Sequence, residues 1–207
     1  LLSKCYLGQA LIPQAKEKIE QAILKKPQNA KYWDLLADCY LELGDWREAI
    51  KALDNSMRAA PQNAETNYRM GMIYSFHEEY HEALRCFQGC CQLRPREFLY
   101  WEMKAEMHLL LEQLKDACNS YERALRYGGT PDLAARLAYC YVQNGEVKKG
   151  IQYYKYTLKY EPDHYDSLSN LAAVYQNLGR SQEALTLLEN ANRWTPPSKE
   201  SWSRSPS

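Results

Sequence analysis

Small side chains recur at three fixed places in a period of about 34 residues, and this recurrence constrains the fold more than any other feature. A large side chain at such a place would push two crossing helices apart. The pattern therefore predicts closely packed helix pairs. The three sets are Ser3, Ala37, Gly71, Ala105, Ala138 and Ala172; Ala15, Ala49, Ala83, Ala117, Gly150 and Ala184; and Ala22, Ser56, Cys90, Ala124, Thr157 and Ala191.

The block 30–63 is a complete copy of the pattern and predicts two helices joined by a tight turn. Trp33 and Tyr40 share one face of the first helix by their spacing. Gly44-Asp45 breaks that spacing, and Asp45 is suited to cap the second helix.

Proline, glycine and capping residues mark where copies end. Pro61 cannot continue a helix interior, and Asn63 is suited to cap the next helix. In the fourth copy, Gly128-Gly129 predicts a left-handed helix stop. Thr130 is then expected to cap the following helix, with Pro131 at its first position.

This spacing resembles the tetratricopeptide repeat, whose pattern is W-x-x-L-G-x-x-Y, then A-x-x-x-F-x-x-A, then P. The best copy reads Trp33-x-x-Leu36-Ala37-x-x-Tyr40, then Ala49-x-x-x-Leu53-x-x-Ser56, then Pro61. The resemblance covers residues 1–198 and implies an all-α fold, a right-handed superhelical solenoid of antiparallel helix pairs.

Six repeats are expected in one solenoid, the first of them truncated, with Pro13 near the start of its second helix. The chain begins at Leu1, partway into a helix, which predicts a fragment of a longer protein. Residues 199–207 are expected to be a flexible tail or the start of a cut seventh repeat. The repeats are 1–29 (partial), 30–63, 64–97, 98–130, 131–164 and 165–198.

Composition favours a protein of the reducing cytoplasm that binds neither nucleic acid nor membrane. Lysine and arginine total 26, as do aspartate and glutamate, so no net charge attracts an anionic surface. Seven cysteines, an odd number without a C-x-x-C pair, argue against a disulfide framework. No apolar run approaches the roughly 18 residues of a membrane span, and no signal peptide pattern is present.

In the resembled family, the first helix of each pair lines a concave groove that binds peptides or partner helices. We expect an acidic and aromatic groove here, and a partner that is basic or mixed with apolar residues. The groove candidates are Asp34, Asp38, Glu42, Tyr68, Met72, Phe76, Glu102, Glu106, Leu109 and Tyr139. Family members that hold the acidic tails of Hsp90 or Hsp70 use Lys and Asn, which these slots lack, so that partner is not expected.

Two other interpretations stay open. The repeats could be a substrate-recruiting or regulatory arm of an enzyme whose catalytic domain lies elsewhere. Glycosyltransferases of the O-GlcNAc type resemble this plan, but only Asn170 occupies their asparagine ladder here. The other positions of that asparagine ladder hold Leu35, Arg69, Met103 and Arg136.

The second open interpretation is self-association, which the open ends of a solenoid favour.

Other constellations have simpler explanations, and no catalytic, metal or cofactor site is expected. His77, His81, Cys86 and Cys90 could in principle hold zinc, but Cys90 fills a packing slot. Lys104 and His108 replace apolar or aromatic residues in the fourth repeat. The apolar stem of the lysine is expected to pack along the helix surface while its ammonium group reaches water. Lys148, Lys149, Lys155 and Lys159, with Tyr153 and Tyr156, are expected to form a solvated convex face.

Overall fold

The computed structural model describes the backbone of residues 2–193 and the side chains of residues 11–192. Every regular element in that range is an α-helix, and the helices form two compact units that divide between Met107 and His108. The first unit holds α1 (Leu2–Lys25), α2 (Ala30–Glu42), α3 (Trp46–Ala59), α4 (Ala64–Phe76), α5 (Tyr80–Leu93) and most of α6 (Phe98–Leu110). The second holds α7 (Leu114–Gly128), α8 (Pro131–Gln143), α9 (Val147–Tyr160), α10 (Tyr165–Asn177) and α11 (Ser181–Arg193).

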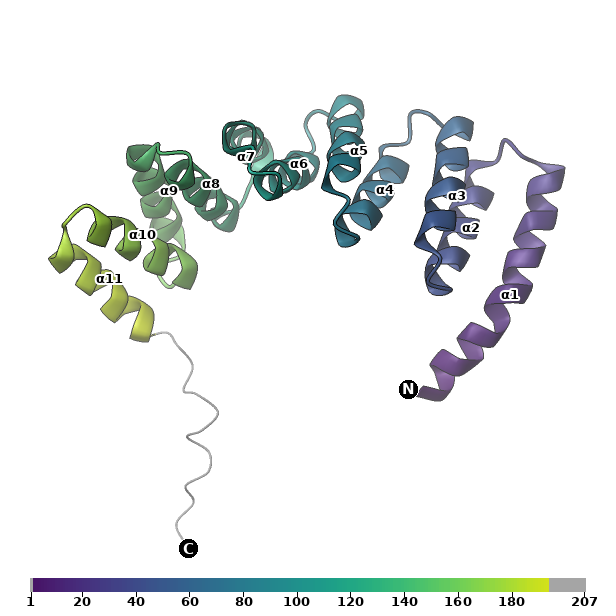
Figure 1. The fold of residues 1–207 in the computed structure, drawn as a ribbon, viewed down its shortest axis with the longest axis horizontal. Coiled ribbons are helices and arrows are strands. Elements are labelled where there is room, and N and C mark those ends of the chain that lie inside the picture. The colour runs from purple at the N-terminus through teal and green to yellow at the C-terminus, as the bar shows by residue number, and fades with distance from the viewer. Residues whose placement is uncertain (1, 194–207) are drawn as a thin grey trace, which may run out of the picture. The chain divides into compact units, whose positions relative to one another are not determined.

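Within each unit, helices pack as antiparallel pairs joined by tight turns (Figure 1). The pairs are α2 with α3 and α4 with α5 in the first unit, and α8 with α9 and α10 with α11 in the second. The predicted fold class, an all-α solenoid of antiparallel helix pairs, is confirmed.

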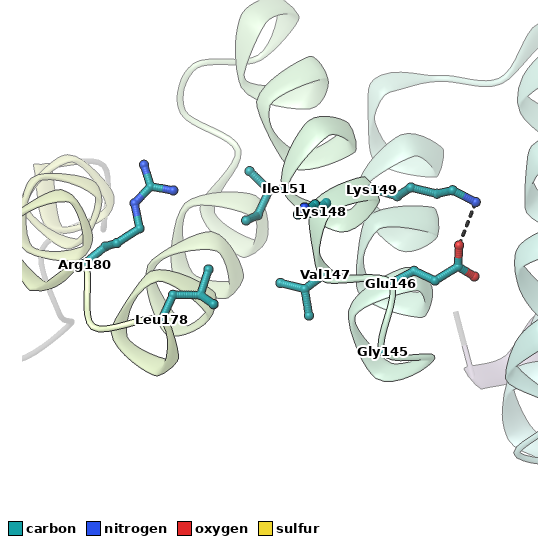
Figure 2. Close-up of a pocket in the computed structure, with 8 residues that line it drawn as sticks. All are labelled: Gly145, Glu146, Val147, Lys148, Lys149, Ile151, Leu178 and Arg180. Atoms are coloured by element: carbon teal, nitrogen blue, oxygen red, sulfur yellow. Dashed lines mark ion pairs between the residues drawn. The ribbon is translucent and has the colours of Figure 1, made fainter.

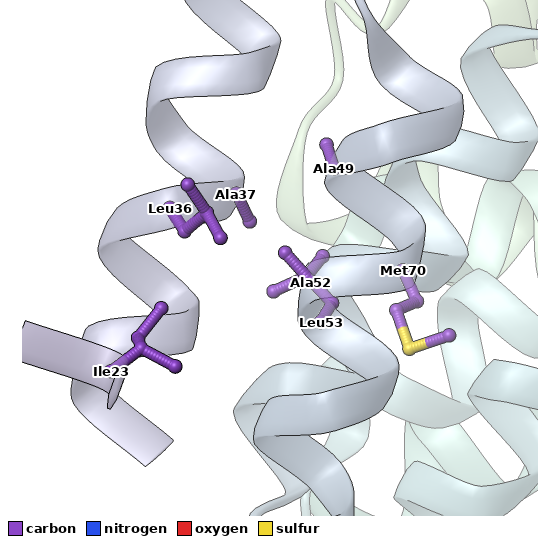
Figure 3. Packing of buried hydrophobic residues seen from close by; sticks show 7 residues of the cluster. All are labelled: Ile23, Leu36, Ala37, Ala49, Ala52, Leu53 and Met70. Carbon is purple, nitrogen blue, oxygen red and sulfur yellow. The ribbon is translucent and has the colours of Figure 1, made fainter. Parts of the chain in front are cut away.

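The small residues lie where helices come closest. Ala37 and Ala49 are fully buried, and Figure 3 shows them between α2 and α3 beside Leu36 and Leu53. Close approach leaves no space for even one more methyl group at some of these places. A Cβ atom on Gly150 would lie 2.5 Å from Cγ2 of Val142 and 2.9 Å from the carbonyl oxygen of Ala138.

The expectation of two helices in residues 1–29 is wrong. Helix α1 is continuous from Leu2 to Lys25 and contains Pro13. The later pairs turn at a residue with positive φ, such as Gly44 at 81°. The matching place in the first copy holds Ala10, for which a left-handed backbone is costly. With no helix folded back on it, Ala15 is exposed, unlike its buried counterparts.

Three of the predicted helix ends are confirmed. Asn63 accepts a hydrogen bond from the Glu65 amide at 3.1 Å, and Thr130 accepts one from the Leu133 amide at 3.3 Å. Pro131 is the first residue of α8, and Gly128 at the end of α7 has a φ of 135°.

The predicted side-chain cap at Asp45 is wrong. Asp45 precedes α3, but its side chain makes no capping hydrogen bond. Its ψ is 63°, whereas Asn63, which does cap, is extended with a ψ of 97°. The tight turn after Gly44 thus imposes a backbone conformation that takes the carboxylate out of capping position.

Replacement of Gly150 by Ala tests the helix contact. We expect the free energy of unfolding to fall by about 1–3 kcal/mol, because the backbone of α8 cannot yield to the new methyl group. Gly89→Ala is the matched control: it also lies in a helix, but its Cβ would meet the side-chain amide of Asn67 at 3.2 Å. There the gain in helix propensity of about 0.5–1 kcal/mol is expected to dominate. Urea denaturation followed by circular dichroism measures both, and equal effects would contradict the contact.

The turn before α5 stores backbone strain that a glycine would relieve. Glu78 has a φ of 62°, at the place where three other turns have glycine and one has Glu112. Glu78→Gly is expected to raise the free energy of unfolding by about 1 kcal/mol. The reverse change, Gly44→Ala, is expected to lower it by a similar amount, because nothing lies within 4 Å of its Cβ position and only the backbone cost remains. Thermal denaturation would show the two shifts with opposite signs.

Candidate partner-binding surface

The first helices of neighbouring pairs lie side by side in the first unit. Arg69 on α4 reaches two aspartates on α2, and the rings of Tyr68 on α4 and Tyr100 on α6 have centroids 5.8 Å apart. These contacts join α2, α4 and α6 into one continuous face, which we call the inner face. Eight of the ten groove candidates belong to these three helices within the first unit.

Two of the predicted acidic residues form an ion-pair network. The Arg69 guanidinium hydrogen-bonds to Oδ1 of Asp38 and lies 3.9 Å from Oδ1 of Asp34. The hydroxyl of Ser56, which is fully buried on α3, donates to Asp34 at 2.7 Å. Asp34 therefore helps to join α2, α3 and α4, and the negative charge of this part of the face is partly neutralised. Glu42, at the end of α2, is exposed.

Tyr68, predicted to line the groove, is partly buried in the packing of the first unit. Its ring lies 6.0 Å from that of Phe87, between centroids, and it is half-buried. Burial raises the pKa of its phenol, and nearby carboxylates, among them those of Glu102 and Glu106, raise it further. The charges of the two glutamates of α6 therefore act on Tyr68, which couples these three groove candidates electrostatically.

The most exposed apolar candidates are at the end of α4. Phe76 is 83% exposed and Met72 is 43% exposed. Leu35 and Leu41 on α2 are exposed as well. Leu35 occupies the repeat position of Arg69, so its exposed side chain adds apolar area that the candidate set omits.

The remaining two candidates lie in the second unit. Tyr139 on α8 is 41% exposed, and Leu109, at the end of α6, is half-buried. On the same helix, Asp132 accepts a hydrogen bond from Nε of Arg136 at 3.0 Å and lies 3.4 Å from Nε2 of His164. Charged groups of α8 are thus paired with each other and with the start of α10.

Figure 2 shows a depression in the second unit that the sequence pattern did not indicate. Its volume is about 620 Å³, and it lies between the turn before α9 and the turn before α11. Val147, Ile151 and Leu178 face it, and Arg180 stands beside it. Glu146 and Lys149 also line the depression, and they pair with each other at 2.6 Å (Figure 2). Two turns at equivalent places of consecutive repeats, Gly145 and Gly179, come together with the start of α9 to form this surface.

The unusual pair in the fourth repeat is accommodated by local contacts. Nζ of Lys104 lies 5.2 Å from the centroid of the Trp101 ring, as in a cation–π contact. His108 is buried, and its Nδ1 lies 2.7 Å from Oε1 of Gln113. The ammonium group of Lys104 and the imidazole of His108 therefore each have an interaction partner among apolar neighbours.

The side chains weighed as zinc ligands have other surroundings. His77 stacks on Trp46 with centroids 4.2 Å apart, and the Cys90 thiol donates to the carbonyl oxygen of Ala64. Burial raises the pKa of Cys86 to about 11 and that of Cys90 to about 12, which opposes the thiolate that zinc needs. Within the described part of the chain, no three potential ligands gather to hold a metal ion.

The fold and the inner face define a helical-repeat protein, and comparisons with known proteins give its family. Tetratricopeptide repeat models match residues 4–64, 64–97 and 153–186. The chain belongs to the tetratricopeptide repeat family, as the sequence pattern predicted.

Relatives and solved structures agree with that family. The chain is 23% identical to the BBSome complex member BBS4 of Bos taurus over 86% of this chain and 36% of that protein. It is 24% identical to the PEX5-related protein of Rattus norvegicus over 80% of this chain and 30% of that protein. The crystal structure of YrrB, described as a tetratricopeptide repeat protein with an unusual peptide-binding site, matches with a TM-score of 0.74 and 20% identity over 89% of this chain and 95% of YrrB.

A crystal structure of the MamA protein matches with a TM-score of 0.76 and 19% identity, over 87% of this chain and 99% of MamA. The chain spans only about a third of the length of its curated relatives. Among the described helices, none combines the length and the apolar character needed to cross a membrane.

Arg69→Gln tests the network on the inner face. We expect the free energy of unfolding to fall by up to about 1 kcal/mol, because the pairs are partly exposed, and the effect to shrink as salt is added. Arg58→Gln is the matched control, since Arg58 pairs with Asp54 at 2.8 Å within a single helix. The control is expected to cost less, about 0.3–0.5 kcal/mol. Urea denaturation at low and high salt checks both, and an effect of Arg69→Gln that salt leaves unchanged would contradict the network.

Proposed function

We propose that the inner face of the first unit binds a segment of a partner protein that carries basic and apolar side chains. The family supports the general role, a protein–protein interaction scaffold. The observation that carries the specific proposal is the exposure of Phe76, a large aromatic side chain of α4 that is 83% accessible. Exposed apolar side chains mark an interaction surface when they form a contiguous patch with a polar rim, and Met72 precedes Phe76 by one turn of α4.

Charge on the inner face favours a basic partner. Arg69 is occupied by Asp34 and Asp38, so it does not offset the other carboxylates. Glu42 stands at the repeat position of Phe76, one pair before it, and Glu106 stands near Tyr68. Apolar contacts with Met72 and Phe76 would supply most of the affinity, and the carboxylates would set the orientation and the rate of association.

The acidic tails of Hsp90 and Hsp70 do not fit this face. A carboxylate tail would meet Asp38 and Glu42 where a clamp needs cations, and like charges repel. Leu109 and Tyr139 of the second unit remain candidates for a further contact with the same class of partner.

A second proposal is that the chain is a recruiting or regulatory arm of a larger enzyme. It draws support from the relatives, of which the chain spans only about a third. The sequence that flanks these residues in the intact protein tests it, because a catalytic domain there would favour the arm over a pure scaffold.

Two labelled peptides of equal length, one of alternating lysine and leucine and one of alternating glutamate and leucine, test the proposed surface. Fluorescence anisotropy is expected to show binding of the lysine peptide only. Phe76→Ala is expected to weaken binding roughly tenfold, which corresponds to about 1.4 kcal/mol. Glu102→Gln together with Glu106→Gln is expected to reduce the salt dependence of binding.

Leu24→Ala is the matched control, because Leu24 is 84% exposed on α1, apart from the three helices of the inner face. It should leave the affinity unchanged. Equal binding of the two peptides, or equal losses in the Phe76 and Leu24 variants, would contradict the assignment.

A further inference from the structure

Two cysteine side chains meet in the interior of the second unit. Cys118 lies on α7 and Cys140 on α8, and their Sγ atoms are 3.2 Å apart. They are 3% and 0% exposed. The thiol of Cys118 donates a hydrogen bond to Cys140, whose own thiol lies 3.4 Å from the carbonyl oxygen of Leu114.

We propose that Cys118 and Cys140 form a reversible oxidation site, at which a small hydroperoxide converts the two thiols into a disulfide that joins α7 to α8. A disulfide bond is about 2.0 Å long, so the two sulfur atoms need to approach by about 1.2 Å. Both helices belong to one compact unit, so this approach needs only local adjustment of two neighbouring helices.

Packing alone does not explain why the contact between α7 and α8 holds two cysteines. The corresponding positions of the neighbouring repeats hold aliphatic or methionine pairs, and each pair lies in one core cluster. A larger aliphatic pair is therefore compatible with this repeat geometry, and the cysteines give the contact a chemistry that the others lack. The corresponding pairs are Ile50 with Ile73, Leu84 with Met107, and Ile151 with Val174.

The hydrogen bond between the sulfurs makes the two thiols unequal, because Cys118 donates and Cys140 accepts. It lowers the pKa of Cys140, although burial acts in the opposite direction. The same hydrogen bond and burial raise the pKa of Cys118. Cys140 is therefore the sulfur that carries the negative charge when the pair ionises, and the thiolate is the nucleophile in such reactions.

The steps balance with one hydroperoxide as the oxidant. The Cys140 thiolate attacks the terminal peroxide oxygen, the O–O bond breaks, and a sulfenic acid forms while the alkoxide leaves and takes up a proton. The Cys118 sulfur then attacks the sulfenic sulfur, the S–S bond forms, and water leaves with the thiol proton. Two thiols are oxidised, one peroxide is reduced to an alcohol and water, and a dithiol reductant reverses the change.

The experiment treats the folded chain with hydrogen peroxide, alkylates the remaining thiols under denaturing conditions, and maps tryptic peptides. The expected product is a crosslink between peptides 116–123 and 137–148 that dithiothreitol removes. Oxidised glutathione, which is bulkier, is expected to react more slowly because both sulfurs are buried. The melting midpoint is expected to rise on oxidation, because a disulfide restricts the unfolded chain.

Cys118→Ser and Cys140→Ser are each expected to abolish this crosslink, whereas Cys39→Ser, a half-buried cysteine of the first unit, should leave it in place. Circular dichroism shows whether each variant is folded, and the peptide map of the unaltered chain stands without them. Sulfinic acid at either cysteine without a crosslink, a stable glutathione adduct there, or a lower melting midpoint after oxidation would each overturn the proposal.

Discussion

The structure depends on contacts in which a small residue of one helix faces a large residue of the next. A Cβ atom on Gly71 would lie 2.7 Å from the Phe87 ring, and both residues are buried. The small partner cannot grow without separating the helices, whereas the large partner varies between aliphatic and aromatic. Tyr121 and Tyr154 are almost fully buried at the repeat position of Phe87. The fold is therefore specified mainly by the small residues, because they allow neighbouring helices to approach closely.

This division separates the residues that specify the fold from those that can specialise. Small residues at helix contacts recur in every repeat and carry little information about a partner. The exposed positions of the first helices differ from one repeat to the next, as Asp38, Met72 and Glu106 do at one shared position. Binding specificity in such an array comes from these variable positions, because the scaffold holds them at regular spacing.

Local chemistry explains what the sequence predicted well and what it did not. Small slots, the caps at Asn63 and Thr130, and the fold class follow from rules that act within a few residues or within one helix pair. The continuous helix through Pro13 did not follow, because the pattern alone does not show that Ala10 stands where a turn needs positive φ. The missing cap at Asp45 likewise depends on a turn geometry that composition does not reveal.

Interactions between repeats limited the prediction of the inner face. Asp34 and Asp38 looked like free carboxylates along the sequence, but Arg69 reaches both across the gap between α2 and α4. Tyr68 likewise looked solvent-facing by its spacing but packs beside Phe87 and Tyr100. Single-helix periodicity places a side chain on a face, whereas its partner comes from the neighbouring helix.

The contact between Cys118 and Cys140 shows how a repeat array can gain chemistry without altering its architecture. Ile50 and Ile73 pack against one core cluster, where dispersion and the hydrophobic effect stabilise the contact between neighbouring repeats. Cysteine is small and apolar enough to occupy the same place, so the substitution keeps the helix stack. Because the helix stack also fixes the distance between the two side chains, a pair of cysteines at such a contact places two sulfurs within reach of each other at 3.2 Å. The regular spacing that makes the array stable is thus also what makes a crosslink between its helices geometrically accessible.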